Sequence, residues 1–408
     1  MLDIALLFFS ICSYGFGKIN DTLPVTLSNI LICACFIYHI AFSLRNRVIY
    51  YNNYLLALLA FILFGAIINN TYGSLFEKAQ FIIYYLVYSL TIIAIVNKHG
   101  AEKLLRLYVV VCFSIAALGL VQSISHAAGI SVVNELIRTF SENKNTSMSG
   151  GFIRSTSIAS EPALLGLYLL PAIVLSISRL FGIDGTSSLI RRREVFVILA
   201  SALSTLSLIV YIYLLAISLF FLIKQRRPYL CIIVAVFFFS IYEAAYNIES
   251  ISSRLGELTG PSSIGDSQNL SVIAFSSNLN VTMESLKSNL LIGTGIASHA
   301  EKYENLVYAF YSHTTYGVGL NKDDAASMIL RTLSEFGVIG FIIFYSAPLL
   351  YFFRQKYSTN NLVQEVFLIS FFLYGLRYGS INTAIFWFYL CAFLGSYSKK
   401  YGFKAYRF

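Results

Sequence analysis

Long apolar stretches recur along almost the whole chain, separated by shorter polar segments. A hydrocarbon core of about 30 Å needs roughly 20 mostly apolar residues in one helix, and most of the stretches approach that length. The pattern therefore predicts an all-α, polytopic membrane protein, folded as a single transmembrane domain over residues 1–408. The stretches lie near residues 2–17, 23–44, 54–69, 79–97, 104–129, 162–180, 194–223, 229–246, 334–353, 362–378 and 381–397.

The stretch at 194–223 is too long for one span. As a single helix its 30 residues would run about 45 Å. Arginines precede it at 191–193, and Lys224, Arg226 and Arg227 follow it, so both ends favour the cytoplasmic side of a membrane. We expect two shorter helices that meet at the polar patch 204–207, which brings the predicted count to about twelve transmembrane helices.

Composition and charge agree with a membrane protein. The chain is 57% hydrophobic and only 12% charged, which leaves too few polar side chains to cover a soluble globule of this size. If both termini are cytoplasmic, 18 of the 29 Lys and Arg residues fall on cytoplasmic segments, as the positive-inside rule requires. The net charge of +9 is therefore an orientation signal, and nucleic acid is not expected as a partner. The six cysteines all lie in apolar stretches, which argues against a disulfide framework.

Two long loops are predicted on the outer, periplasmic side, at 130–160 and 247–327. Loops of this length are usually functional or disordered. In the second, Leu279, Met283, Leu286 and Leu290 follow one another at spacings of 4, 3 and 4 residues, which is one face of a helix. We expect an amphipathic helix that ends near Gly293 and lies at the membrane surface or closes over a cavity.

The first group of candidate residues is in the segment RSTSIASEPALLGLYLLP, which begins at Arg154. Arg154 and Glu161 flank four hydroxyl side chains, and Pro162 sits at the expected first turn of a helix with Ser160 as its cap. An arginine beside a helix N-terminus suits an anion such as phosphate. The alternative is an ordinary capped helix start with a structural Arg/Glu pair.

Charged residues also fall at the outer ends of later spans. Arg331 and Glu335 are four residues apart, hence on one helix face, at a depth where an unpaired charge is rare. Arg377 lies near the outer junction of the last two spans. The alternatives are a helix-stabilising pair for the first two and a snorkelling side chain for Arg377.

The large loop offers three further candidates. Arg254 follows two serines, and His299 and His313 lie on either side of a tyrosine-rich stretch. A histidine serves as a general base near neutral pH. The alternative is that both histidines are plain surface residues.

Together these segments resemble the O-antigen polymerase (Wzy) family, within the superfamily that includes the O-antigen ligases. The matching pieces are R-S-x-S-x-x-S-E-P-x-x-x-G at 154–166, NLLIGTG at 289–295, LRTLSEFGVIG at 330–340 and the end GLRYGSIN…FWFYL. The chain departs from the family pattern at Leu290, where relatives often have proline, and around Ala274, where many carry a further arginine.

The resemblance implies a glycosyltransferase of the bacterial inner membrane with its active site facing the periplasm. The hydroxyl of an incoming undecaprenyl-diphosphate-linked oligosaccharide would attack the anomeric carbon of the growing chain and release undecaprenyl diphosphate. No cofactor or metal is required, because arginines neutralise the diphosphate, and a chain-length regulator is an implied partner. The implied substrate-binding residues are Arg154, Arg254 and Arg331, then Arg377, Glu335 and His299, with His313 as the preferred base and Glu161 as its competitor.

Two other functions remain open. An O-antigen ligase would transfer the glycan to lipid A-core, and topology and charge do not separate it from a polymerase; the SEP and SEFGVIG segments favour the polymerase. A flippase for lipid-linked oligosaccharide could also have twelve spans. Its expected short loops and related halves contrast with the 81-residue loop and the lack of a visible repeat in this sequence.

Overall fold

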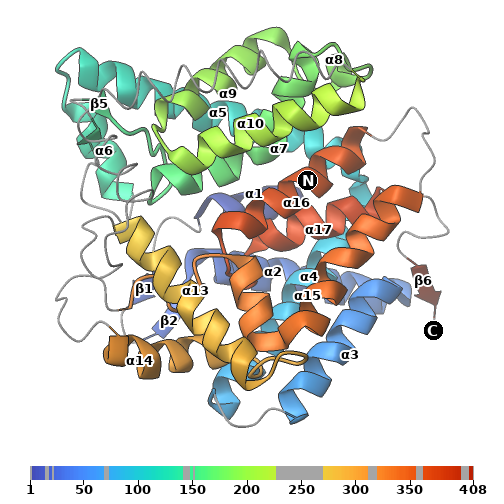
Figure 1. Cartoon of the computed structure of the whole chain (residues 1–408). Helices are drawn as coiled ribbons and strands as arrows, with labels where there is room; N and C mark the ends of the chain where they lie inside the picture. Colours follow the sequence, from blue (N-terminus) through green and yellow to red (C-terminus); the bar gives the residue numbers. More distant parts are fainter. Residues whose placement is uncertain are drawn as a thin grey trace.

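Figure 1 shows the computed structural model of the chain. The structure describes residues 2–13, 18–20, 23–68, 73–140, 148–149, 152–226, 270–310, 319–354, 362–396 and 404–407. Its helices are α1 (Leu2–Ser13), α2 (Leu27–Asn46), α3 (Asn53–Ile68), α4 (Leu75–His99), α5 (Ala101–Ala127), α6 (Val132–Phe140), α7 (Pro162–Leu180), α8 (Thr186–Leu189), α9 (Arg192–Ser204), α10 (Leu208–Lys224), α13 (Leu270–Ser288), α14 (Ser298–Phe310), α15 (Met328–Arg354), α16 (Leu362–Arg377) and α17 (Ala384–Gly395).

The mostly helical, membrane-embedded character that the sequence predicts is confirmed. Among the described residues, five helices are long and apolar enough to cross a membrane: α2, α4, α5, α7 and the part of α15 up to Leu350. Four more apolar helices are shorter, namely α1, α3, α10 and α17. The predicted span at 229–246 lies outside the described residues, so the count of twelve stays a prediction.

The long stretch at 194–223 forms two helices, as its length and flanking charges predict. α9 ends at Ser204 and α10 begins at Leu208, and the turn between them places Leu206 at φ 46°. The Thr205 hydroxyl and backbone N–H both donate to the Ala202 carbonyl oxygen, at 2.7 and 3.4 Å, which closes the C-terminal end of α9. Figure 1 shows the two helices as a hairpin whose members both pack against α7.

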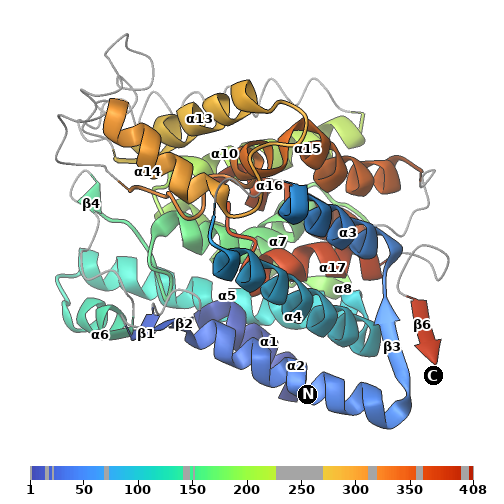
Figure 2. The ribbon, with the colours of Figure 1, turned by 90° about the horizontal axis from the view of Figure 1, so that it is seen from below.

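The core is built around α7 and α17. Every residue of α17 from Ala384 to Leu394 is buried, as expected for a helix that is apolar on all sides. α16 and α4 pack on α17, while α5, α9, α10 and α16 pack on α7. In the turned view of Figure 2, α1 and α2 lie along one side and α13 and α14 along the opposite side, with α7 and α17 between them.

In the described part of the chain, three two-stranded antiparallel ribbons lie at the ends of the helical body. At the left of Figure 1, β1 (Lys18–Asn20) pairs with β2 (Leu23–Thr26) and β4 (Met148–Ser149) with β5 (Phe152–Ile153), close to α6 and α14. We name this side the loop end. At the right, β3 (Val48–Tyr51) pairs with β6 (Lys404–Arg407), and α8 and the C-terminus lie on this side, named the basic end.

A buried charge cluster ties α1 to α4. The Asp3 carboxylate is almost fully buried and lies 2.9 Å from Lys98 Nζ and 2.9 Å from His99 Nε2. His39 Nε2 of α2 lies 3.8 Å from the same carboxylate. Removing one member of such a buried pair leaves an uncompensated charge, so the cluster holds the first helix to the bundle.

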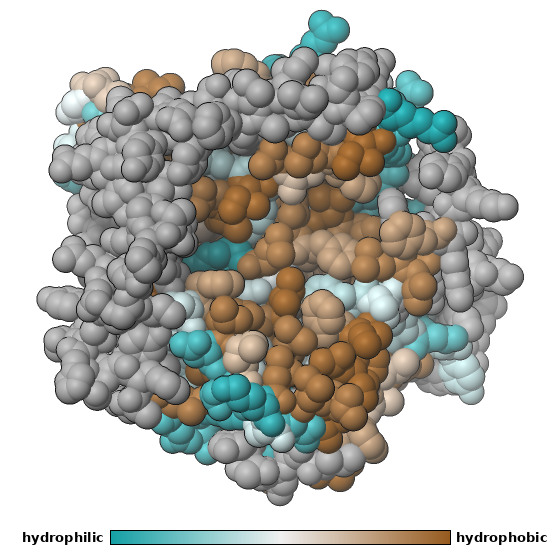
Figure 3. All heavy atoms as spheres, in the orientation of Figure 1, coloured by the Kyte–Doolittle hydropathy of each residue, from teal (hydrophilic) through white to brown (hydrophobic). Residues whose placement is uncertain are grey.

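The outer surface of the bundle is apolar. Figure 3 shows apolar side chains over the middle of the face seen in Figure 1. Ile342 and Phe353 of α15 and Ile223 of α10 are all more than half exposed. An exposed apolar surface of this extent marks a membrane or an interaction site, in agreement with a membrane-embedded chain.

The amphipathic helix expected in the large loop is present as α13, although it ends at Ser288 and not near Gly293. Its predicted apolar face, with Leu279 and Met283, is turned outward and exposed. The opposite face, with Asn278 and Thr282, is buried against α14 and α15. The helix therefore presents apolar side chains away from the protein, and its polar side chains bond to the bundle.

Candidate functional site

The serines of the RSTS segment fasten this segment to the helix bundle. Ser155 and Ser157 are fully buried, and their hydroxyls donate to the Gly119 and Ile115 carbonyl oxygens of α5 at 2.9 and 2.8 Å. Gln122 Oε1 accepts the backbone N–H groups of Thr156 and Ser157 at 3.0 and 2.9 Å. These hydroxyls are therefore occupied by backbone partners, and the segment serves to position its neighbours.

Arg154 begins this segment and is half-buried. Its charge interacts electrostatically with the phenol of Tyr211 on α10, so the guanidinium faces the α9/α10 hairpin. Arg154 is not among the residues that line the pocket described next. Its predicted role in binding a diphosphate stays a prediction.

Glu161 occupies the N-cap position of α7, with Pro162 in the first turn. The prediction for Pro162 is confirmed, whereas the cap is Glu161 and not Ser160, one residue later than predicted. The reason is that Ser160 lies in the bend that leads from the bonded serines to the helix. The Glu161 carboxylate, with its side chain 54% exposed, pairs with Arg377 NH2 at 3.6 Å.

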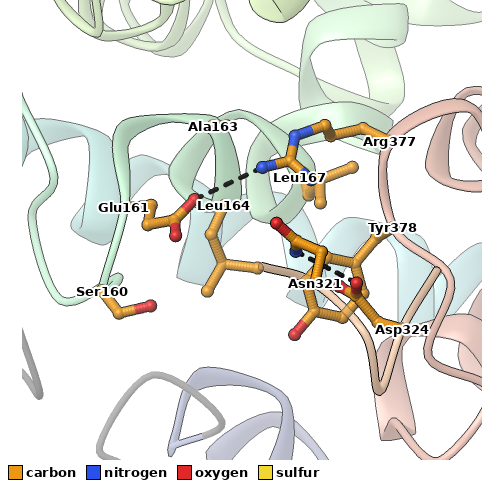
Figure 4. A pocket seen from close by; sticks show the side chains of 9 residues that line it. All are labelled: Ser160, Glu161, Ala163, Leu164, Leu167, Asn321, Asp324, Arg377 and Tyr378. Carbon is orange, nitrogen blue, oxygen red and sulfur yellow. Dashed lines mark hydrogen bonds and ion pairs between the residues drawn. The ribbon is translucent and has the colours of Figure 1, made fainter. Parts of the chain in front are cut away.

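A pocket of about 110 Å³ surrounds this ion pair. Figure 4 shows that its walls come from three segments far apart in the sequence: the start of α7, the turns before α15, and the end of α16. The polar groups of Glu161, Asp324 and Arg377 face a common space, and apolar side chains of α7 form one wall. The lining residues are Ser160, Glu161, Ala163, Leu164, Leu167, Asn321, Asp324, Arg377 and Tyr378.

Asp324 is the pocket residue that the sequence pattern did not single out. Its Oδ1 accepts hydrogen bonds from Asn321 Nδ2 and from the Ala326 backbone N–H, each at 3.0 Å. Burial raises the pKa of the carboxyl, and the hydrogen bonds and the charges of Arg377 and Arg331 oppose this effect only in part. The available signal was the pair of adjacent acidic residues at 323–324, about ten residues before the predicted span at 334–353.

Arg331 joins the two loops that carry pocket residues. Its Nε pairs with Glu335 Oε1 at 3.2 Å, as the four-residue spacing predicts. Its NH1 donates to the carbonyl oxygens of Asp323 at 3.1 Å and Gly379 at 3.3 Å. The residue is only 8% exposed, and its guanidinium holds the loop before α15 against the loop after α16. This geometry favours a positioning role for Arg331.

His299 and Glu335 belong to a buried network behind the pocket. His299 Nδ1 lies 3.0 Å from Ser334 Oγ, and His299 Nε2 lies 2.8 Å from Asn278 Oδ1. Because Asn278 Oδ1 only accepts, Nε2 carries the proton and Nδ1 accepts from the serine. The Glu335 carboxylate interacts with two backbone N–H groups at the start of α14, those of Ala297, directly before the helix, and of His299 in its first turn.

Burial, reinforced by the charges of Arg331 and Lys302, lowers the pKa of His299 to about 3. The side chain is 2% exposed, so His299 stays neutral at physiological pH and has no open path to a substrate. The structure thus brings His299, Arg331 and Glu335 together but gives them a supporting place beside the pocket. Arg254 and His313 lie outside the described residues.

Two of the glycine-containing segments that the sequence singled out interlock in the structure. α15 is interrupted at Gly337, whose φ of 64° and ψ of −165° are not helical. The 289–295 segment fills the break: Thr294 and Gly295 N–H groups donate to the Ser334 and Glu335 carbonyl oxygens, and Leu290 and Leu291 carbonyl oxygens accept from Val338 and Ile339. All four bonds are 2.9 to 3.0 Å long, so the broken helix keeps its backbone satisfied.

The close approach of the 289–295 segment to the break in α15 explains why both segments have glycine at the point of contact. A Cβ atom at Gly293 would lie 2.6 Å from backbone atoms of Glu335 and Gly337, and one at Gly337 would lie 2.5 Å from the Leu291 backbone. Both positions also have φ of +64°, which L side chains rarely adopt. Only glycine fits either position.

No three His, Cys, Asp or Glu side chains lie together as metal ligands would in the parts of the chain that the structure describes. The chemistry that these residues offer is that of a cation, Arg377, beside two carboxylates. No family model matches the chain, and a search of curated proteins and of solved structures found no match either.

Proposed function

We propose that the chain is an O-antigen polymerase: a membrane glycosyltransferase that joins undecaprenyl-diphosphate-linked oligosaccharide units. The single observation that carries the proposal is the pocket at Glu161, Asp324 and Arg377. It unites the SEP segment, the residues directly before the SEFGVIG helix and the LRYG segment, which are the pieces that carry the family resemblance.

The pocket offers the groups that the reaction needs. The acceptor hydroxyl attacks the anomeric carbon of the growing chain, its proton passes to a carboxylate, and the bond from that carbon to the diphosphate oxygen breaks. Arg377 supplies positive charge for the leaving diphosphate. Asp324 is our candidate for the base, because burial raises its pKa and a base should titrate near the working pH.

The proposed orientation places the loop end in the periplasm and the basic end, with both termini, in the cytoplasm. The positive-inside rule supports it, because the arginines at 191–193 lie at the start of α9, at the basic end. The bilayer is the bacterial inner membrane, where lipid-linked sugars are found. A chain-length regulator is the partner implied by the resemblance.

A lipopolysaccharide gel tests the proposal, with a strain deleted for this gene beside the same strain complemented with the wild type. Loss of the ladder with a single repeat unit left on lipid A-core would support the polymerase. Bare core would point to ligation or flipping, and lipid-linked polymer accumulating in the periplasm would then identify a ligase. An unchanged ladder would refute all three functions.

A variant pair separates the pocket from general folding. Arg377→Gln should abolish the ladder, because it removes the cation from the pocket, whereas Arg226→Gln at the basic end should leave it intact. Both variants must reach the membrane in equal amounts. A full ladder from Arg377→Gln would show that this pocket is not the site.

A further inference from the structure

A second pocket lies at the basic end and shares no residue with the first. Its volume is about 340 Å³, and its walls come from the first turns of α5 and from the segment that joins α8 to α9. In Figure 1 α8 and α9 lie together beside α5 along the upper edge of the bundle. The lining residues are Arg106, Val109, Val110, Ser187, Ser188, Leu189, Ile190, Arg191 and Glu194.

The pocket carries net positive charge, because two arginines and one glutamate line it. Glu194 lines it too, but its carboxylate accepts the Arg191 backbone N–H at 2.7 Å and lies 4.0 Å from Arg191 Nε, so it is engaged in capping α9. Within the segments that the structure describes, no carboxylate pairs with Arg106. Arg192 and Arg193 follow Arg191 and are exposed. Guanidinium groups of this kind bind phosphate oxygens in a bidentate manner.

One border of the pocket is formed by exposed apolar surface. Val110 lies one helical turn after Arg106, on the same face of α5, and is 52% exposed. Phe196 and Leu203 are exposed on α9, which packs along α5. The basic pocket thus opens next to the exposed apolar side chain of Val110, and further apolar side chains are exposed on the neighbouring helix.

We propose that this pocket binds the phosphate of an anionic phospholipid, with Arg106 and Arg191 on the headgroup and an acyl chain along Val110 of α5. A free phosphate would use the arginines but not the apolar border, whereas a phospholipid uses both. Basic pockets between membrane helices on the cytoplasmic side suit such headgroups. The proposal rests on the membrane-embedded fold and does not depend on the proposed glycosyltransferase function.

Native mass spectrometry of the full chain in detergent, titrated with phosphatidylglycerol, tests the proposal. The wild type should bind one phosphatidylglycerol tightly and phosphatidylethanolamine much more weakly. Arg106→Gln/Arg191→Gln should weaken phosphatidylglycerol binding about 30-fold, because each basic residue near a lipid surface contributes about fivefold. Arg106→Lys alone should retain most of the binding, since it keeps the charge.

The matched control is Arg45→Gln/Arg47→Gln, which removes two exposed arginines, one in the last turn of α2 and one at its C-cap, and should leave the affinity unchanged. Equal melting temperatures of all variants in lipid-free detergent show that each is folded. If the pocket variant binds phosphatidylglycerol as tightly as the control variant, the proposal is wrong. Displacement of the lipid by an equal concentration of inorganic phosphate would overturn the assignment to a phospholipid.

Discussion

At the residue scale, environment decides which candidate groups are able to react. His299 and Asp324 are both titratable and close to Arg331, yet burial acts on them in opposite ways. The pKa of the histidine falls to about 3, because its charged form is the protonated one, and the pKa of the aspartate rises, because its charged form is the deprotonated one. The neutral histidine supports the fold, and the aspartate lines the pocket.

Asp324→Asn should reduce polymer synthesis by about 100-fold or more, which is the usual loss on removing a general base. Asp323→Asn is the matched control: it changes the neighbouring exposed side chain, while the Asp323 carbonyl that accepts from Arg331 remains. The measurement is the rate of chain extension from a lipid-linked donor by purified protein. Full activity of Asp324→Asn with loss in Glu161→Gln would assign the base to Glu161 instead.

His299 should make the protein less stable in acid. Its folded-state pKa of about 3 lies below the ordinary value of 6.5, so unfolding takes up a proton below pH 6.5. The stability that the neutral side chain contributes is present above pH 6.5 and is lost as the pH falls toward about 3. His299→Gln keeps a neutral hydrogen-bonding side chain and should remove about 1.4 kcal/mol per pH unit of this slope. Melting temperatures at pH 7 and pH 5 in detergent measure the difference, and parallel slopes would contradict it.

At the element scale, the break in α15 is the feature that organises the loop end. A helix interrupted at membrane depth needs other partners for its backbone groups, and the 289–295 segment supplies them. The same break sets the first part of α15, with Arg331, beside the loop after α16. The interlocked glycines therefore place the pocket loops as well as stabilising the helix.

Gly293→Ala and Gly337→Ala should each destabilise the protein by about 3 kcal/mol or more, through positive φ and through a clash with backbone that cannot move aside. Gly185→Ala is the matched control, since Gly185 also has positive φ, 81°, in the left-handed helical region, but no atom within 4 Å of an added Cβ. This variant should lose only about 1 to 2 kcal/mol. Thermal melting in detergent ranks the three, and equal losses would mean that the interlock is unimportant.

At the scale of the whole molecule, the arginine cluster and the pocket loops lie at different ends of the helix bundle. The arginines at 191–193 lie at the basic end, and the pocket loops connect the helices at the other ends of α7, α15 and α16. This asymmetry suits a chain that is held in one orientation across a membrane.

Cysteine labelling should reveal that orientation. In a variant without native cysteines, Ser187→Cys at the basic end should react with a membrane-impermeant maleimide only after the inner membrane is opened. Ile130→Cys, in an exposed position after α5, should react in spheroplasts with an intact membrane. The reverse pattern would invert the proposed topology.

What the sequence by itself determined is local. Apolar length located the helices, flanking charge together with excessive length located the α9/α10 turn, and the four-residue spacing paired Arg331 with Glu335. These features follow from neighbours along the chain, because helix formation and helix-face contacts act over a few residues.

Only the tertiary structure decided which distant segments meet. Glu161 and Arg377 are separated by more than half the chain, yet they form one ion pair. Asp324 lines the same pocket, and Gly293 lies against the backbone of Gly337. It also buried His299, which the pattern alone presented as a candidate binding residue. Such contacts depend on how whole helices pack, and no periodicity along the chain carries that information.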